Sequence, residues 1–184
     1  METANVSRYR YIHYGTDKFD PARLNGYLKN GNCPRKPVGA VIWASPAETD
    51  DWLIWCGAEE FREGSFSKSF TFTLRDPSKI IFIRNEQDLL HAIDRFSIPD
   101  SELDDYWRDV KETEGKVLAW DPIWGGPIIC LDFVKMQEEG YDGIHIDAGS
   151  EYCLYWAFYG WDVNSIAIWN PDQIVVERCY NDDI

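Results

Sequence analysis

The chain has 184 residues, enough for one domain with a substantial buried core. Its 18 basic and 32 acidic side chains give a formal net charge of −14, which disfavours extended contact with nucleic acids or anionic membranes. The five cysteines include no Cys-x-x-Cys pair, so we expect reduced thiols and no metal site. We see no leader before Tyr9 and no apolar run near the roughly 18 residues of a membrane span, so we expect a cytoplasmic protein.

Hydrophobic periodicity and turn residues divide the chain into short elements. In chain order we predict strand 9–12, helix 20–29, strand 40–43, helix 48–56, strands 66–74 and 79–83, helices 86–96, 101–111 and 128–139, strand 143–146, helix 151–159, and strands 164–169 and 173–178. We expect strands 66–74 and 79–83 to form a hairpin-like pair across the turn at Asp76. Because strands and helices are segregated rather than alternating, the pattern predicts an α+β fold in one domain, residues 1–184.

Most histidines and cysteines offer weak candidates for chemistry. His145 is flanked by isoleucines inside a strand, so we expect it to be half-buried on the polar face. His91 lies on helix 86–96 beside two leucines, and we expect a structural role. Cys56 and Cys153 would act as nucleophiles only beside a histidine, and no local signature indicates one.

Three segments point to a binding site. The first is His13-Tyr14-Gly15-Thr16, where a glycine lets the backbone approach a bound group and a histidine offers a ring nitrogen. The second is Trp43-Ala44-Ser45, on a short apolar strand. The third is the stretch Gly-Tyr-Asp-Gly-Ile at 140–144, followed after an insert by Ile-Trp-Asn-Pro-Asp-Gln-Ile at 168–174. With 28 aromatic residues in the chain, we expect some of them to line a groove for a planar ligand.

In their order, these segments resemble the ADP-ribosyltransferase superfamily, the fold shared by poly(ADP-ribose) polymerases and diphtheria-type toxins. That family ends one strand in His-Gly-Ser/Thr, carries an aromatic before a small residue on a second, and has a Gly-Tyr-Asp-Gly-Ile strand before an Asn/Asp-Pro-x-Gln-Ile strand. The segment 74–80 also looks like a strand–turn–strand of bacterial members. The resemblance covers most of the chain and implies split antiparallel β-sheets with flanking helices, in a divergent bacterial or phage-type member.

The resemblance also implies roles for individual residues, with NAD as the substrate. His13 would hydrogen-bond the adenosine ribose, and the backbone of Gly15 would meet the nicotinamide amide. Trp43 takes the place of the aromatic that stacks near the nicotinamide. Ser45 would be a small polar support, and Tyr14 would add a wall to the pocket.

The sequence departs from the family at the catalytic carboxylate. Aligning the chain on Asn170 puts Ser165 where the family has its glutamate, and a serine can orient a hydroxyl but cannot offset positive charge. Glu151 and Asp162 are the candidates to replace the carboxylate. Asp142 is more simply a turn-stabilising residue.

We therefore expect an NAD-dependent mono-ADP-ribosyltransferase or NAD glycohydrolase that cleaves the nicotinamide–ribose bond without a metal. The acceptor of ADP-ribose stays open among protein, nucleic acid, small molecule and water. The alternative is a non-catalytic binding module, or an acidic immunity- or antitoxin-like protein that neutralises a basic partner. The missing glutamate and the charge of −14 motivate this alternative.

Overall fold

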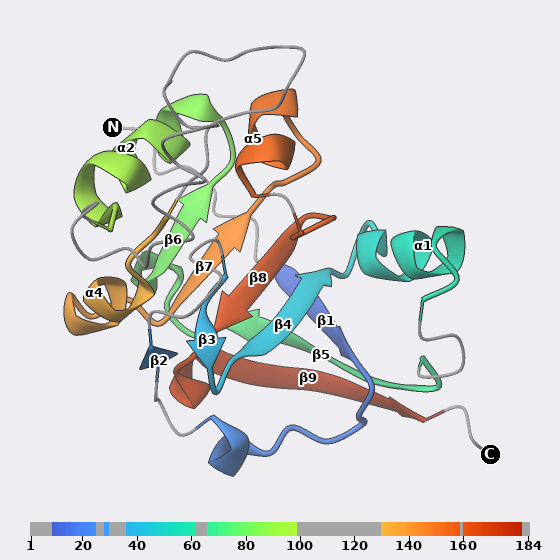
Figure 1. Ribbon diagram of the computed structural model, residues 1–184. Helices are drawn as coiled ribbons and strands as arrows, with labels where there is room; N and C mark the ends of the chain where they lie inside the picture. The colour runs from blue at the N-terminus through green and yellow to red at the C-terminus, as the bar shows by residue number, and fades with distance from the viewer. Residues whose placement is uncertain are drawn as a thin grey trace, which may run out of the picture.

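A seven-stranded sheet lies at the centre of the computed structural model, which describes residues 9–24, 28–29, 36–61, 66–98, 130–158 and 160–181 (Figure 1). The elements are β1 (Arg10–Tyr14), β2 (Leu28–Lys29), β3 (Val38–Gly39), β4 (Ile42–Pro46), α1 (Asp51–Ala58), β5 (Lys68–Leu74), β6 (Ile80–Ile83), α2 (Glu86–Phe96), α4 (Phe133–Glu138), β7 (Gly143–Ile146), α5 (Tyr152–Ala157), β8 (Ser165–Ile168) and β9 (Ile174–Asn181). The strand order is β6-β7-β8-β4-β1-β5-β9, and β2 pairs separately with β3. The predicted α+β class is confirmed.

The sheet divides into two wings that meet at β1 and β4. These strands pair antiparallel through Tyr11 with Pro46 and Ile12 with Ser45, and the remainder of β4 pairs with β8. We call β6-β7-β8-β4 the β4 wing, β1-β5-β9 the β1 wing, and the junction between them the seam. In Figure 1, β1 and β4 diverge from the seam toward the bottom of the view. The β4 wing contains one parallel pair, β6 with β7, so the expectation of purely antiparallel sheets is wrong at this edge.

Two hydrophobic cores cover opposite faces of the sheet. One core packs α2, α4 and α5 against the β4 wing, where Ile144 and Ile146 of β7 are fully buried. The other core gathers the rings of Tyr11, Phe70 and Phe72 from the β1 wing. Successive side chains of a strand point to opposite faces, and β8 accordingly contributes Ala167 to the first core and Ile166 and Ile168 to the second.

The predicted helix 20–29 is wrong. Asp20 does cap a turn, since its side chain accepts from the backbone N–H of Ala22, but this 3-10 turn spans Pro21–Arg23 alone. Leu24 then packs in the core of the β1 wing, whereas Leu28 packs in the core beneath the helices. Two residues four apart on one helix share a face, so these two destinations exclude a continuous helix.

The predicted hairpin of strands 66–74 and 79–83 is also wrong. β5 pairs with β1 on one edge and with β9 on the other, which leaves no edge for β6. β6 instead lies at the far end of the β4 wing beside β7. The turn between them agrees with the prediction, because the Asp76 side chain caps a 3-10 turn over Pro77–Lys79.

Other predictions are confirmed with shifted bounds. Helix 86–96 and strand 143–146 match α2 and β7 at both ends. Helix 128–139 shortens to α4, since Leu131 forms an isolated bridge with Ser97. Strand β4 begins two residues later than the predicted strand 40–43, and α1 begins three residues later than the predicted helix 48–56. The predicted helix 101–111 lies outside the described residues.

Asp142 joins the two halves of the third motif. Its Oδ1 accepts from Asn170 at 2.8 Å and its Oδ2 accepts from the amide of Gln173 at 2.7 Å. Its backbone oxygen accepts from the N–H of Trp169 at 3.0 Å. The expected structural role of Asp142 is confirmed, and these bonds fix β7 against the start of β9.

We expect Asp142→Ala to lower the free energy of unfolding by about 2–3 kcal/mol, because the Gln173 amide, 4% exposed, would be left without its acceptor. Asp172→Ala is the matched control, since Asp172 is exposed and the change there should stay within about 0.5 kcal/mol. Urea denaturation followed by circular dichroism measures both. Equal effects of the two substitutions would contradict the assignment.

Candidate functional site

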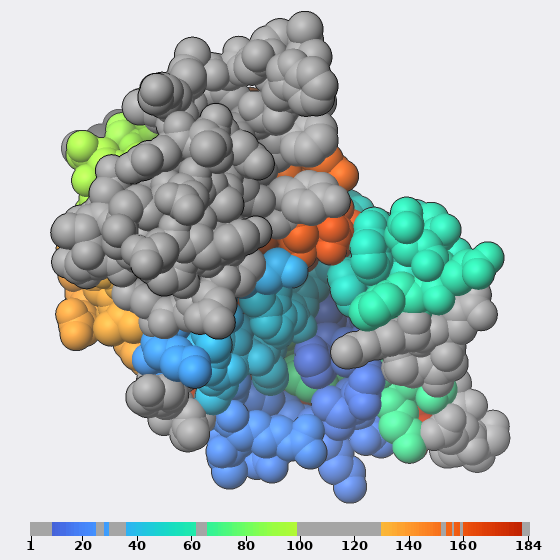
Figure 2. Space-filling model, viewed as in Figure 1, coloured from blue at the N-terminus to red at the C-terminus, as the bar shows by residue number. Residues whose placement is uncertain are grey.

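The motif segments that lie far apart in the sequence become neighbours in the sheet. Strand β7 carries the Gly143-Ile144 end of the third motif, β8 carries Ser165, β4 carries the second motif, and β1 ends in the first. These four strands are consecutive in the order β7-β8-β4-β1. Figure 2 shows the surface hollowed along the diverging strands of the seam, with α1 at its rim. We call this hollow the seam cleft.

His13 bridges the seam with its side chain. Its Nδ1 lies 2.7 Å from the carbonyl oxygen of Trp43, and its ring packs 5.2 Å from that of Phe70. Because a carbonyl oxygen only accepts, Nδ1 carries the proton and Nε2 is an acceptor in the neutral ring. Burial lowers the pKa of His13 despite its hydrogen bond to the backbone of Trp43. The residue therefore offers a fixed, neutral acceptor nitrogen.

Ser45 has a buried hydroxyl without a hydrogen-bond partner in the described part of the chain. The residue is 2% exposed and pairs with Ile12 at the seam. The β4–β8 register, continued by one residue, puts Ser45 opposite Ser165, whose Oγ donates to the carbonyl of Val163 at 3.0 Å. Buried hydroxyls in native proteins almost always have a partner, so the Ser45 hydroxyl marks a place where a water or a bound group would supply one.

The His13 ring contacts the backbone carbonyl of Trp43 and not the Trp43 ring. The Trp43 ring packs against the core beneath the helices and lies edge-on to Trp161, with centroids 4.7 Å apart. The His13 ring contacts Phe70, which belongs to the core on the opposite face. The two side chains therefore leave the sheet on opposite faces.

Tyr14 and Gly15 end β1 beside α1. The Tyr14 hydroxyl donates to Oδ1 of Asp50 at 3.2 Å, and burial, followed by the Asp50 charge, raises the pKa of Tyr14. Gly15 has φ +101°, and a Cβ there would meet nothing within 4 Å, so open space adjoins its backbone. Its N–H already donates to the carbonyl of Lys68 at 2.8 Å. Any backbone contact from Gly15 to a ligand amide would thus use its carbonyl oxygen.

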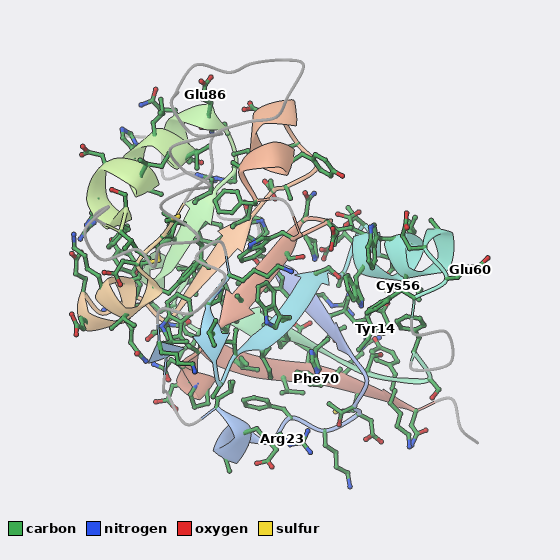
Figure 3. All side chains as sticks on the ribbon, viewed as in Figure 1. Tyr14, Arg23, Cys56, Glu60, Phe70 and Glu86 are labelled. Atoms are coloured by element: carbon green, nitrogen blue, oxygen red, sulfur yellow. The ribbon has the colours of Figure 1, made fainter. Side chains whose placement is uncertain are left out.

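The two candidate carboxylates lie in different places. Oε2 of Glu151 accepts from the N–H of Glu86 at 3.0 Å, at the first residue of α2. Figure 3 shows Glu86 and Tyr14 on opposite sides of the molecule. Asp162 directly follows Trp161, whose ring contacts Trp43 on β4. It holds the left-handed conformation, with φ 64°, and is partly exposed.

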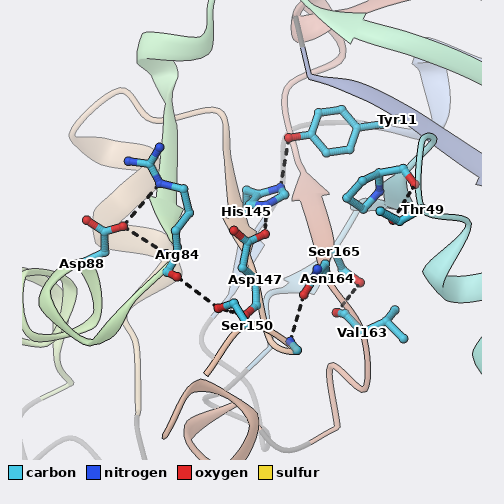
Figure 4. A network of polar contacts seen from close by, with 12 residues as sticks. Tyr11, Thr49, Arg84, Asp88, His145, Asp147, Ser150, Val163, Asn164 and Ser165 are labelled. Atoms are coloured by element: carbon cyan, nitrogen blue, oxygen red, sulfur yellow. Dashed lines mark hydrogen bonds and ion pairs between the residues drawn. The ribbon is translucent and has the colours of Figure 1, made fainter. Parts of the chain in front are cut away.

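A buried polar chain, which the sequence did not predict, crosses the seam above β4 and β8. His145 Nε2 lies 2.7 Å from Oδ1 of Asp147, and its Nδ1 lies 3.0 Å from the Tyr11 hydroxyl (Figure 4). The carboxylate only accepts, so Nε2 carries the proton and a neutral ring accepts from Tyr11. We call these three residues the Tyr11–His145–Asp147 chain.

The expectation of a half-buried His145 is wrong, because its exposure is 0%. The Tyr11 side chain reaches it from β1, and the rings of Tyr9 and Phe82 flank it at 5.6 and 5.4 Å. Nothing local in the sequence marks this arrangement, since it depends on the order of the strands. His91 is exposed on α2, where its Nε2 lies 3.2 Å from the Gln87 amide.

Comparison with known proteins finds no family model, no curated protein and no solved structure that matches the chain. Among the described residues, no group of three or more His, Cys, Asp or Glu side chains is arranged to hold a metal ion. Within the same residues, every helix is too short or too polar to cross a membrane. The functional assignment therefore depends on the geometry of the seam.

We expect Tyr11→Phe to lower the free energy of unfolding by about 1–3 kcal/mol, because Nδ1 of the buried His145 would lose its donor. Tyr180→Phe removes the same atom from an exposed residue of β9 and should change stability by less than about 0.5 kcal/mol. Chemical denaturation compares the two. A loss no greater in Tyr11→Phe than in Tyr180→Phe would contradict the role of the Tyr11–His145–Asp147 chain.

A second prediction concerns the pH dependence of stability through His13. Since burial lowers its pKa from 6.5, the unfolded chain takes up this proton at a higher pH than the folded chain. The contribution of neutral His13 is complete above pH 6.5 and falls as the pH decreases toward the folded pKa. We expect the melting temperature of the wild type to fall relative to His13→Gln between about pH 7 and pH 5.

The control for this experiment is His91→Gln, because His91 is exposed on α2. Its melting temperature should follow that of the wild type over the same pH range. A difference between the wild type and His13→Gln that does not change with pH would contradict the prediction.

Proposed function

We propose that the chain is an NAD-dependent mono-ADP-ribosyltransferase, acting as an NAD glycohydrolase when water is the acceptor. The observation that carries the proposal is the adjacency of β7, β8, β4 and β1, which bear the motif segments in consecutive positions of one sheet. A chance likeness of short segments gives no reason for them to occupy neighbouring strands of one sheet. The hollow along that seam supplies a place for a ligand (Figure 2).

His13 would position the ribose. Its Nε2 is an acceptor, which suits a ribose hydroxyl, and its ring is held between the Trp43 carbonyl and Phe70. Holding the sugar in one orientation lowers the entropic part of the barrier to cleavage. The carbonyl of Gly15 would add a polar contact at the end of β1, whereas the orphaned hydroxyl of Ser45 lies on the face of Trp43, opposite to the His13 ring.

Trp43 takes a different role from the one that the resemblance implied. Its ring packs on Trp161 beneath the helices, so a ligand beside His13 would meet the backbone of Trp43 and not its aromatic face. Tyr14 directly follows His13 on β1 and so points to the opposite face, where it would form a wall for the part of a ligand that extends past the end of the strand. Its hydroxyl is fixed by Asp50, which keeps the ring in place.

The chemical step breaks the bond between C1′ of the ribose and the nicotinamide nitrogen. The bonding electron pair leaves with the nicotinamide and neutralises its ring charge, and positive charge develops on the ribose. A nearby carboxylate stabilises that charge, and the acceptor then bonds to C1′ and loses its proton. We propose Asp162 for this role over Glu151, because Glu151 binds the start of α2, whereas Asp162 is partly exposed and follows Trp161, which packs on β4 from the face opposite to the His13 ring.

Lys36 supports NAD binding near Asp162. The chain carries a net charge of −14, so an anionic dinucleotide needs a local cation. A Cβ added to Gly160, with φ +95°, would lie 3.4 Å from the Lys36 ammonium nitrogen. This lysine therefore lies beside the loop that leads into Asp162, where it would meet the pyrophosphate.

A specific observation also favours the non-catalytic alternative. Ser165 replaces the family glutamate, is 7% exposed, and donates its hydroxyl to the carbonyl of Val163. A seam with His13 but without a carboxylate at 165 would bind NAD without cleaving it. Turnover and binding must therefore be measured separately.

The test is nicotinamide release from NAD by the purified protein. We expect His13→Ala to lower the rate about tenfold or more, and Asp162→Asn to lower it about a hundredfold, the usual cost of removing one transition-state contact. Glu151→Gln, the matched carboxylate control, should keep the wild-type rate within about twofold.

The outcomes separate the two candidates. NAD that raises the melting temperature without releasing nicotinamide would favour the binding module. If NAD neither raises the melting temperature nor releases nicotinamide, the proposed function is wrong. If Glu151→Gln abolishes release and Asp162→Asn does not, the assignment of the carboxylate is wrong and the function stands.

A further inference from the structure

Helix α1 carries large apolar side chains that the fold leaves exposed. Leu53 is 36% exposed and Ile54 is 66% exposed, whereas Cys56 on the same helix is fully buried. Phe61, three residues after the helix, is 39% exposed. Exposed apolar side chains gathered on and just after one helix of a small protein are typical of an interaction site.

An aromatic cluster makes this surface rigid. The rings of Trp52 and Trp55 stack with centroids 5.1 Å apart and an interplanar angle of 16°. The Phe61 ring lies edge-on to both, at 6.1 and 5.6 Å. These contacts hold the apolar side chains in place without covering Ile54. We define the α1 ridge as Trp52, Leu53, Ile54, Trp55 and Phe61.

Acidic residues flank the α1 ridge in the sequence. The stretch 48–61 contains five acidic residues and no lysine or arginine, and Arg62 follows it. The five are Glu48, Asp50, Asp51, Glu59 and Glu60. A partner surface with apolar side chains among lysines or arginines would complement both the apolar side chains of the ridge and its acidic neighbours. A nucleic acid would be repelled through its phosphates, and a second copy of the ridge would be repelled by its own acids.

The α1 ridge also lies beside the seam cleft. Helix α1 follows β4, and Asp50, directly before it, accepts from the hydroxyl of Tyr14 at the end of β1. In Figure 2, α1 stands out from the surface at the edge of the hollow. A protein bound to α1 would therefore hold part of its surface next to Tyr14, at the edge of the seam cleft.

We propose that the α1 ridge docks a partner protein whose contact surface combines apolar side chains with lysine or arginine. The binding itself does not depend on NAD. We assign this partner a second role, as the acceptor of ADP-ribose. That role rests on the proposed function, because ADP-ribose is transferred only if the site at the seam cleaves NAD.

The test uses three synthetic peptides as probes, with binding measured by isothermal titration calorimetry in the absence of NAD. One is an amphipathic helix of leucine and lysine, the second replaces leucine by serine, and the third replaces lysine by glutamate. We expect the leucine–lysine peptide to bind the wild-type protein at least about tenfold more tightly than either of the others.

Variants locate the binding surface. Leu53→Ser with Ile54→Ser should weaken binding of the leucine–lysine peptide about tenfold. Leu90→Ser is the matched control, since Leu90 is 38% exposed on α2, and it should leave binding unchanged. All three positions are exposed, and circular dichroism verifies that the variants fold.

Several outcomes would overturn the proposal. Equal binding of the serine–lysine peptide would mean that charge alone is recognised. Equal weakening by Leu90→Ser would place the binding surface elsewhere. A wild-type dimer in analytical ultracentrifugation that Ile54→Ser dissociates would make a second copy the occupant. Failure of NAD turnover would leave the peptide result intact, so the two proposals are tested separately.

Discussion

The divergence of β1 from β4 is the constraint on which the candidate site depends. Two residue pairs join these strands, and beyond them the carbonyl of Trp43 accepts a hydrogen bond from the His13 ring. That bond fixes the imidazole tautomer and leaves Nε2 as an acceptor, while burial keeps the ring neutral. One interaction thus connects the two wings and prepares the nitrogen that would meet a ligand.

A junction of two residue pairs needs support from side chains. The Tyr11–His145–Asp147 chain supplies it on one face, because Tyr11 belongs to the β1 wing and His145 to the β4 wing. The Tyr11 hydroxyl and both ring nitrogens of His145 have hydrogen-bond partners, so burying these groups carries little penalty. The angle between the wings is therefore set by packing and hydrogen bonds more than by backbone pairing.

Local signals in the sequence predicted the elements well and their partners poorly. Helix α2 was predicted at both ends because Asn85 caps it and its apolar residues recur at helical spacing. The prediction of a helix over 20–29 was wrong because Leu24 and Leu28 pack in different cores, which no local pattern reveals. The motifs indicated His13 and Ser45, but the opposite faces of His13 and Trp43 follow from the register. The burial of His145 was underestimated because its hydrogen-bond donor, Tyr11, is 134 residues away in the sequence.

The charge of the chain acts in opposite directions on binding and on chemistry. A net charge of −14 repels the pyrophosphate of a dinucleotide, so affinity must come from local groups such as Lys36 beside Gly160. The same field favours the positive charge that develops on a ribose as nicotinamide leaves, and it would assist Asp162 in a site that lacks the usual glutamate. Under the proposed function, this charge distribution would stabilise the transition state more than the bound dinucleotide. Weak NAD binding is therefore compatible with turnover at the seam, and affinity alone is a poor measure of this site.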